Sequence, residues 1–165
     1  MTTSETEYYP LTHQQKEIWY TEKVYQGTTI GTILSTMWLN DTNADSKLLE
    51  KAINICLEKN DACRLRIAEI EGEPKQYVAK YCYQEIDYYD FNGNLEDYRI
   101  LLKKIKSEPF SIIDSNLYYF AIIKINNSEM VYINKGHHLI SDNWSMITKN
   151  INKHRDLSKI KISGI

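Results

Sequence analysis

The chain has 165 residues, of which 42% are hydrophobic and 25% charged, a composition typical of one folded domain and unlike that of a disordered protein. The formal net charge is −2 and Lys and Arg are scattered, so we expect neither a nucleic-acid surface nor a basic membrane-binding face. No apolar run approaches the roughly 20 residues that span a bilayer, and the polar, acidic N-terminus is unlike a signal peptide. The sequence therefore predicts a cytoplasmic protein without membrane contact.

The cysteines are Cys56, Cys63 and Cys82. They lack CxxC spacing and have no histidine at metal-ligand spacing, which argues against a zinc site. An odd number of cysteines without an export signal predicts reduced thiols.

The N-terminal part predicts a short lead-in followed by a helix. Residues 1–8 have the pattern of a flexible lead-in. Thr12 and Gln15 have the spacing of a capping box, which predicts a helix over 13–24. Trp19 is expected on its buried side.

A strand, a second helix and a hairpin are predicted next. Residues 29–39 are β-branched and aromatic, and 64–80 contain a turn between two extended patterns. Arg64 and Arg66 alternate with apolar residues at the start of the hairpin, and two arginines on one strand face are usually solvated. The helix between these elements is predicted over 45–59, with its apolar face formed by Leu48, Leu49, Ala52, Ile53 and Cys56.

The second half predicts further alternating elements and a tail with no clear partner element within this chain. The class is therefore α/β, as an α+β two-layer sandwich with a mixed, largely antiparallel sheet flanked by helices. The predicted segments are an extended stretch at 86–91, a helix at 95–107, strands at 118–125 and 129–134, a helix at 144–154 and the Lys- and Ile-rich tail at 155–165.

Residues 136–145 (GHHLISDNWS) gather polar side chains at the junction of a predicted strand and helix. Adjacent residues of a strand point to opposite faces, so one of His137 and His138 should face a cleft and the other the core. A histidine of near-neutral pKa is the usual general base. Asp142 is a charge partner either for a histidine or for a distant cation, with the arginines of the hairpin as candidates.

Other interpretations of this stretch remain open from the residues alone. A metal site would need a third ligand, and none stands at convincing spacing. Two structural histidines in a packed turn would explain the pattern without chemistry. Nucleophilic catalysis by Ser141 or Ser145 would need an exposed serine elbow, and neither serine lies in a G-x-S-x-G frame.

The stretch HHLISDNWS (137–145) resembles the HHxxxDG motif of condensation domains from nonribosomal peptide synthetases, within the HHxxxD acyltransferase superfamily. Arg64 falls on the second arginine of the family's Arg-His-Glu-x-Leu-Arg pattern. The resemblance runs from residue 9 to about 154 and covers the N-terminal lobe of such a domain. The other segments that resemble the family, in the family's order, are PLTHQQKEIW (10–19), KNDACRLRI (59–67), GEPKQYV (72–78) and EPFSI (108–112).

The resemblance implies a chloramphenicol-acetyltransferase-like lobe that takes part in amide bond formation. A donor acyl or peptidyl thioester on one peptidyl carrier protein is attacked by the amine of an acceptor aminoacyl thioester on another. The 4′-phosphopantetheine arms belong to these donor and acceptor carrier proteins, and no cofactor or metal binds the chain directly. By resemblance, His138 is the catalytic residue, supported by His137, Asp142 and Arg64, with Asp142 paired to Arg64.

Residues after the aspartate are expected close to the substrate and pantetheine, namely Asn143, Trp144 and Ser145. The family has glycine where this chain has Asn143. Asparagine tolerates a positive φ better than most residues. By resemblance, its side chain would intrude near the tunnel in which the two phosphopantetheine arms meet.

The resemblance covers one of the family's two lobes. The tail at 155–165 is expected to lead toward a missing C-terminal lobe, and the isolated lobe is expected to be inactive. Its exposed lobe interface is expected to favour a homodimer. The alternatives are a non-catalytic carrier-protein-binding lobe and another HHxxxD acyltransferase that uses a CoA or carrier-bound donor.

Overall fold

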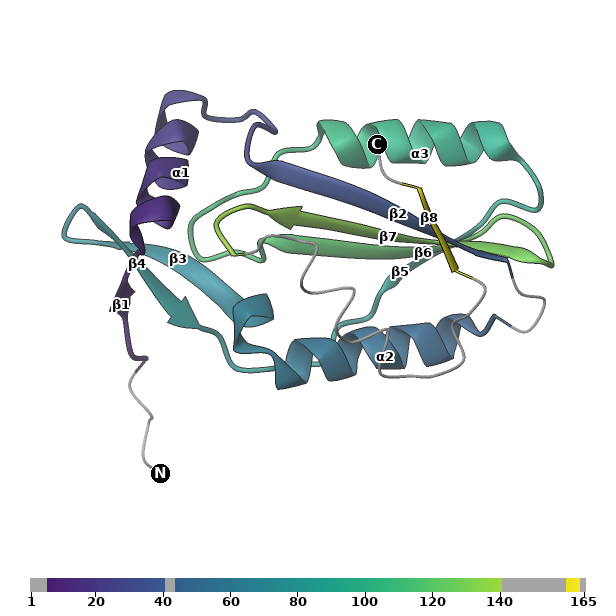
Figure 1. Cartoon of the computed structure of the whole chain (residues 1–165), viewed down its shortest axis with the longest axis horizontal. Helices are drawn as coiled ribbons and strands as arrows, with labels where there is room; N and C mark the ends of the chain where they lie inside the picture. Colours follow the sequence, from purple (N-terminus) through teal and green to yellow (C-terminus); the bar gives the residue numbers. More distant parts are fainter. Residues whose placement is uncertain (1–5, 41–43, 141–159, 164–165) are drawn as a thin grey trace.

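The computed structural model describes residues 6–40 and 44–140, together with the backbone of residues 160–163 (Figure 1). Its helices and strands follow the predicted order closely. They are β1 (Tyr9–Pro10), α1 (His13–Val24), β2 (Thr32–Asn40), α2 (Ser46–Lys59), the 3-10 helix η1 (Asp61–Arg64), β3 (Leu65–Ile70), β4 (Glu73–Val78), β5 (Asp87–Asp90), α3 (Leu95–Ser107), β6 (Tyr118–Lys124), β7 (Glu129–His137) and β8 (Ile160–Ser163).

Two sheets organise the described chain. The larger sheet has the strand order β5-β6-β7-β2-β8, and the smaller has the order β1-β4-β3. Only β5 and β6 run parallel among the described strands. The long strand β7 pairs with β2 along its whole length, from Glu129 opposite Asn40 to His137 opposite Thr32. The predicted mixed, largely antiparallel sheet flanked by helices is confirmed.

Helices cover both faces of the larger sheet, with α3 on one side and α2 on the other (Figure 1). Successive residues of a strand point to opposite faces, so a strand buried on both faces is apolar almost continuously. In β6, Phe120 and Ile122 face α2, whereas Ala121 and Ile123 face α3. The core thus consists of one layer of side chains on each face of the sheet.

A third apolar cluster joins α1, the smaller sheet and the end of β7. Trp19 of α1 is 4% exposed, and Ile67 of β3 is fully buried. Because Leu139 and Ile140 belong to the same cluster, it fixes the turn after β7 against α1. Its members are Leu11, Trp19, Ile67, Leu117, Leu139 and Ile140.

The predicted buried face of α2 is confirmed in part, since Ile53 is buried and Leu49 and Cys56 pack, partly buried, against the core. The other two predicted residues do not lie on it. Leu48 is 66% exposed, and Ala52 is exposed as well. The helix is rotated by about one residue, because a polar side chain, Asn54, is buried at 2% exposure against the segment after β4. The residues that the helix buries are Glu50, Ile53, Asn54 and Leu57.

The prediction that the hairpin arginines face solvent is wrong. Arg64 belongs to η1, and its side chain is 14% exposed. Arg66 of β3 is 8% exposed, donates to Asn116, and lies 5.5 Å from the ring centre of Tyr118. The polar face of β3 is covered by the segment before β6, which returns alongside it with Ile113 bridged to Ile67.

The tail has a partner element, contrary to the prediction. Strand β8 pairs antiparallel with the free edge of β2, with Ile162 opposite Met37. Because β2 is distant from β8 in the sequence, no local pattern predicts this pairing. The predicted helix at 144–154 lies outside the described residues.

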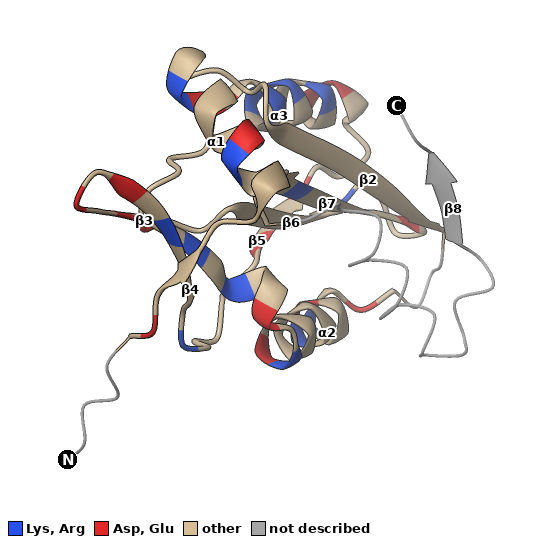
Figure 2. Ribbon diagram, turned by 60° about the vertical axis from the view of Figure 1, so that its left-hand side comes forward, with Lys and Arg blue, Asp and Glu red and all other residues tan. Residues whose placement is uncertain are grey.

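Charged residues of both signs occur along α1, α2 and α3 (Figure 2). None of these described helices is long and apolar enough to cross a bilayer.

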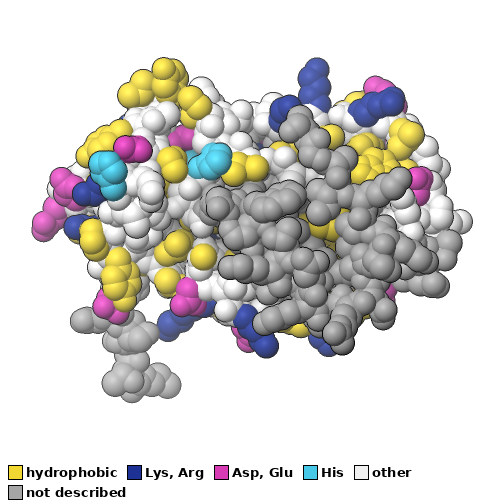
Figure 3. All heavy atoms as spheres, viewed as in Figure 1, with side chains coloured by type: hydrophobic (Ala, Val, Ile, Leu, Met, Phe, Trp, Pro, Cys, Tyr) yellow, Lys and Arg dark blue, Asp and Glu magenta, His cyan; other side chains and the backbone are white. Residues whose placement is uncertain are grey.

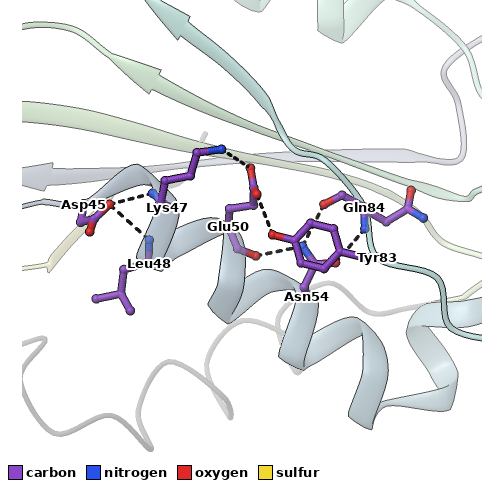
Figure 4. A network of polar contacts seen from close by, with 7 residues as sticks. All are labelled: Asp45, Lys47, Leu48, Glu50, Asn54, Tyr83 and Gln84. Atoms are coloured by element: carbon purple, nitrogen blue, oxygen red, sulfur yellow. Dashed lines mark hydrogen bonds and ion pairs between the residues drawn. The ribbon is translucent and has the colours of Figure 1, made fainter.

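A polar network ties α2 to the segment between β4 and β5 (Figure 4). The side-chain nitrogen of Asn54 donates to the backbone oxygens of Glu50 and Gln84, at 3.0 and 2.9 Å. Its oxygen accepts from Gln84 N at 2.8 Å and from the Tyr81 hydroxyl at 3.2 Å. The buried amide is therefore fully paired, and Glu50 accepts a further bond from the Tyr83 hydroxyl at 2.6 Å.

Replacing Asn54 with Leu should lower the free energy of unfolding by about 2–4 kcal/mol, because it leaves the polar groups of Gln84 without partners. Urea denaturation checks this. Tyr83→Phe is the matched control, since Tyr83 is exposed and loses one bond. It should change the stability by less than about 1 kcal/mol. Equal losses in the two variants would contradict the central place of Asn54.

Candidate functional site

The end of β7 separates the two histidines as predicted. His137 is the last residue of the strand and is 2% exposed, whereas His138 begins the following turn and is exposed. Histidine side chains reach the surface on the face shown in Figure 3. The pair therefore has one buried ring and one ring at the surface.

Both ring nitrogens of His137 have partners. Nε2 lies 3.0 Å from Glu22 Oε1, and Nδ1 accepts the N–H of Leu139 at 3.2 Å. Because Nδ1 accepts, the proton of the neutral ring is on Nε2 and is donated to Glu22. Burial lowers the pKa of His137, and the Glu22 carboxylate opposes this by raising it. The ring also meets Phe110 edge-on, with 6.0 Å between ring centres.

Glu22 links this ring to the loop before β2. The carboxylate is 8% exposed, and its Oε1 also accepts the N–H of Gly31 at 3.0 Å. In turn the oxygen of Gly31 accepts the N–H of His138 at 2.9 Å. A closed ring of contacts therefore runs through Glu22, Gly31, His138 and His137.

The first turn of α1 holds the far side of the turn after β7. Thr12 and Gln15 form the predicted capping box. The side-chain nitrogen of Gln15 also donates to the oxygen of Leu139 and to Gln76 Oε1, both at 2.9 Å. Since Gln76 Nε2 donates to the oxygen of Pro10 at 3.0 Å, three segments singled out in the sequence meet beside His138.

The side chain of Arg64 reaches from η1 to the C-terminal end of α2. Its guanidinium donates to the oxygens of Leu57 and Glu58, each at 2.5 Å, and to the oxygen of Ala79 at 3.1 Å. It also pairs with Asp61 at 2.6 Å. These contacts join the helix end, η1 and the end of β4.

The remaining predicted site residues lie outside the described residues. They are Asp142, Asn143, Trp144 and Ser145, so the expected pair between Asp142 and Arg64 remains a prediction. Among the described residues, no group of three or more His, Cys, Asp or Glu side chains is arranged to hold a metal ion.

Glu22 and Gly31 were missed by the sequence analysis. The signal for Glu22 was present, because it follows Trp19 by three residues and Gln15 by seven, which is the spacing of one helix face. A carboxylate on an apolar face is a sign of a buried partner, but its partner, His137, is distant in sequence. Gly31 carries no signal of its own.

Comparison with known proteins identifies the family. The family model described as "Condensation domain" matches residues 5–149. The chain belongs to the condensation-domain family. Surfactin synthase subunit 1 of Bacillus subtilis (strain 168) is 35% identical over 147 residues, covering 86% of this chain and 4% of that protein. Bacitracin synthase 3 of Bacillus licheniformis is 26% identical over 151 residues, covering 89% of this chain and 2% of that protein.

Solved condensation domains share the fold. The starter condensation domain of rhizomide synthetase RzmA superposes with a TM-score of 0.79 at 15% identity, covering 88% of this chain and 38% of that chain. The first condensation domain of the CDA synthetase superposes with a TM-score of 0.70 at 15% identity, covering 80% of this chain and 36% of that chain. This chain therefore spans well under half of those structures and a small part of the curated relatives.

Arg64→Ala should lower the free energy of unfolding by about 2–4 kcal/mol, since charge-assisted bonds to backbone oxygens at a helix end are lost. Arg64→Lys should recover little of it, because one ammonium cannot span these acceptors. Thermal and urea unfolding check this. The matched control is Arg99→Ala, whose side chain is 70% exposed and 3.3 Å from Glu96. An Arg64→Ala variant as stable as this control would refute the role.

Proposed function

We propose that this chain contributes the first lobe of a condensation site that joins a donor acyl or peptidyl thioester to the amine of an acceptor aminoacyl thioester. The observation that supports it best is the arrangement of the two histidines. His138 is exposed, while its backbone is held by Gly31 and its neighbour His137 is buried and fully paired.

Amide bond formation from a thioester makes modest chemical demands. An α-amine has a pKa of about 8, so a fraction of it is neutral and nucleophilic near pH 7. The proton that the amine loses must be taken up as the tetrahedral intermediate forms, and the two reacting groups must be aligned. General-base help contributes roughly 10²–10⁴-fold, and positioning can contribute more. An exposed imidazole on a fixed backbone suits both tasks.

Donor and acceptor carrier proteins would deliver the substrates on their 4′-phosphopantetheine arms. A C-terminal lobe would complete the tunnel, and this chain alone would be inactive. Exposed apolar side chains at the end of α1 and in the loop after it support a protein-binding surface there. It would take such a lobe or a second copy of this chain. The exposed side chains are Tyr20, Val24, Tyr25 and Ile30.

His138→Ala should lower the rate of condensation by at least about 10²-fold, because the proposed general base is lost. The unfolding midpoint should not change, because the imidazole is exposed. The assay supplies a loaded donor and a loaded acceptor carrier protein and follows the transferred product by mass spectrometry. The chain is tested as residues 1–165 and within a two-lobed condensation domain. His13→Ala is the control, since His13 is exposed and its ring lies 3.2 Å from the exposed Glu17.

A parallel arm of the assay offers an acyl-CoA as donor. A variant of the RzmA starter domain has been solved with C8-CoA, at 16% identity to this chain. Product from acyl-CoA alone would favour an acyltransferase of the wider superfamily over transfer between carriers. Undiminished product from His138→Ala with carrier-bound substrates would reject the proposed role of this histidine.

A further inference from the structure

We infer that Glu22 is a positioning residue for His138. Its carboxylate holds both the ring of His137 and the backbone of Gly31, and these two groups accept the N–H of Leu139 and the N–H of His138 respectively. The inference rests on the proposed function only for the chemical task of His138.

The burial of Glu22 is the first step. A carboxylate withdrawn from water is costly unless hydrogen-bond donors surround it. Glu22 is 8% exposed and meets two donors at 3.0 Å, the N–H of Gly31 and Nε2 of His137. Burial on this face of α1 would be served as well by an apolar side chain. The cost of burying Glu22 therefore points to a role for its two donors.

The second step is the close approach of Gly31. A Cβ atom at this position would lie 2.5 Å from Nε2 and 2.6 Å from Cε1 of His137, closer than real contacts permit. Only glycine lets the loop reach Glu22 and His137 together. From there the oxygen of Gly31 accepts the N–H of His138 at 2.9 Å.

The third step is the bridge over His138. The Nδ1 atom of His137 accepts the N–H of Leu139 at 3.2 Å, so the ring connects the residues before and after His138. This bond requires the Nε2–H tautomer, which the acceptor on Glu22 selects. With the oxygen of Leu139 held by Gln15 at 2.9 Å, the backbone around His138 is fixed at several points.

The test compares Glu22→Ala with Glu22→Gln in the full 165-residue chain. Glutamine keeps an oxygen acceptor where the carboxylate had one, whereas alanine removes it. The readout is ¹⁵N–¹H correlation spectroscopy of the imidazole nitrogens, which reports the tautomer of His137 and the environment of His138. Glu17→Ala is the control on the same helix, since Glu17 has a side chain 68% exposed.

We expect the wild-type chain and Glu22→Gln to show His137 protonated at Nε2. Glu22→Ala should average the two tautomers of His137 and shift the resonances of His138. Unchanged His138 resonances in Glu22→Ala, or no recovery in Glu22→Gln, would overturn the inference. This outcome is independent of condensation activity, so it is distinguishable from failure of the proposed function.

A second measurement decides the case if Glu22→Ala does not fold. Glu22 from α1 and His138 from the turn are the titratable groups whose charges act on His137 in the described chain. The carboxylate raises the pKa of His137, so Glu22→Gln should move its titration to lower pH. An unchanged titration of His137 in Glu22→Gln would refute the contact between Glu22 and His137.

In a two-lobed domain, kcat should fall about tenfold or more in Glu22→Ala at unchanged KM, with partial recovery in Glu22→Gln.

Discussion

The central strand β7 is the constraint on which the site depends. It lies between β6 and β2, is paired along both edges, and is covered on both faces. A strand held in this way has no freedom of register, because a slip by one residue would turn every buried side chain to the wrong face. Its last residue, His137, therefore has a fixed direction, and so does the start of the turn that carries His138. The precision of the site begins in the core of the sheet.

Much of this architecture follows from local patterns. The helices at 13–24, 45–59 and 95–107 are confirmed within one residue, because caps and helical spacing depend on neighbours in sequence. The division into one buried and one exposed histidine is as predicted, although His138 lies just after the strand and not in it. The failures share another cause. The burial of Arg66, the rotation of α2 and the pairing of β8 depend on segments that are distant in the chain.

The same distinction applies within the site. His138 was singled out because two adjacent histidines form a recognisable motif. Glu22 was not singled out, since a glutamate in a helix is usually solvated. Its contact with His137, which is distant in sequence, is what places it in the candidate site. Gln15 was assigned to the helix cap, which is correct, yet its side chain also holds the oxygen of Leu139. A residue that serves both its own helix and a distant turn shows only the local role in the sequence.

These contacts explain why a second histidine stands beside His138. The buried ring must donate to a carboxylate at Nε2 and accept a backbone N–H at Nδ1, on opposite sides of a flat side chain. Neutral imidazole is the side chain that combines one donor and one acceptor in this geometry. An apolar residue at His137 would leave Glu22 and the N–H of Leu139 buried with one partner fewer each, at a cost of about 1–3 kcal/mol per group. The first histidine is thus required by hydrogen bonding, and the second is left exposed at the surface.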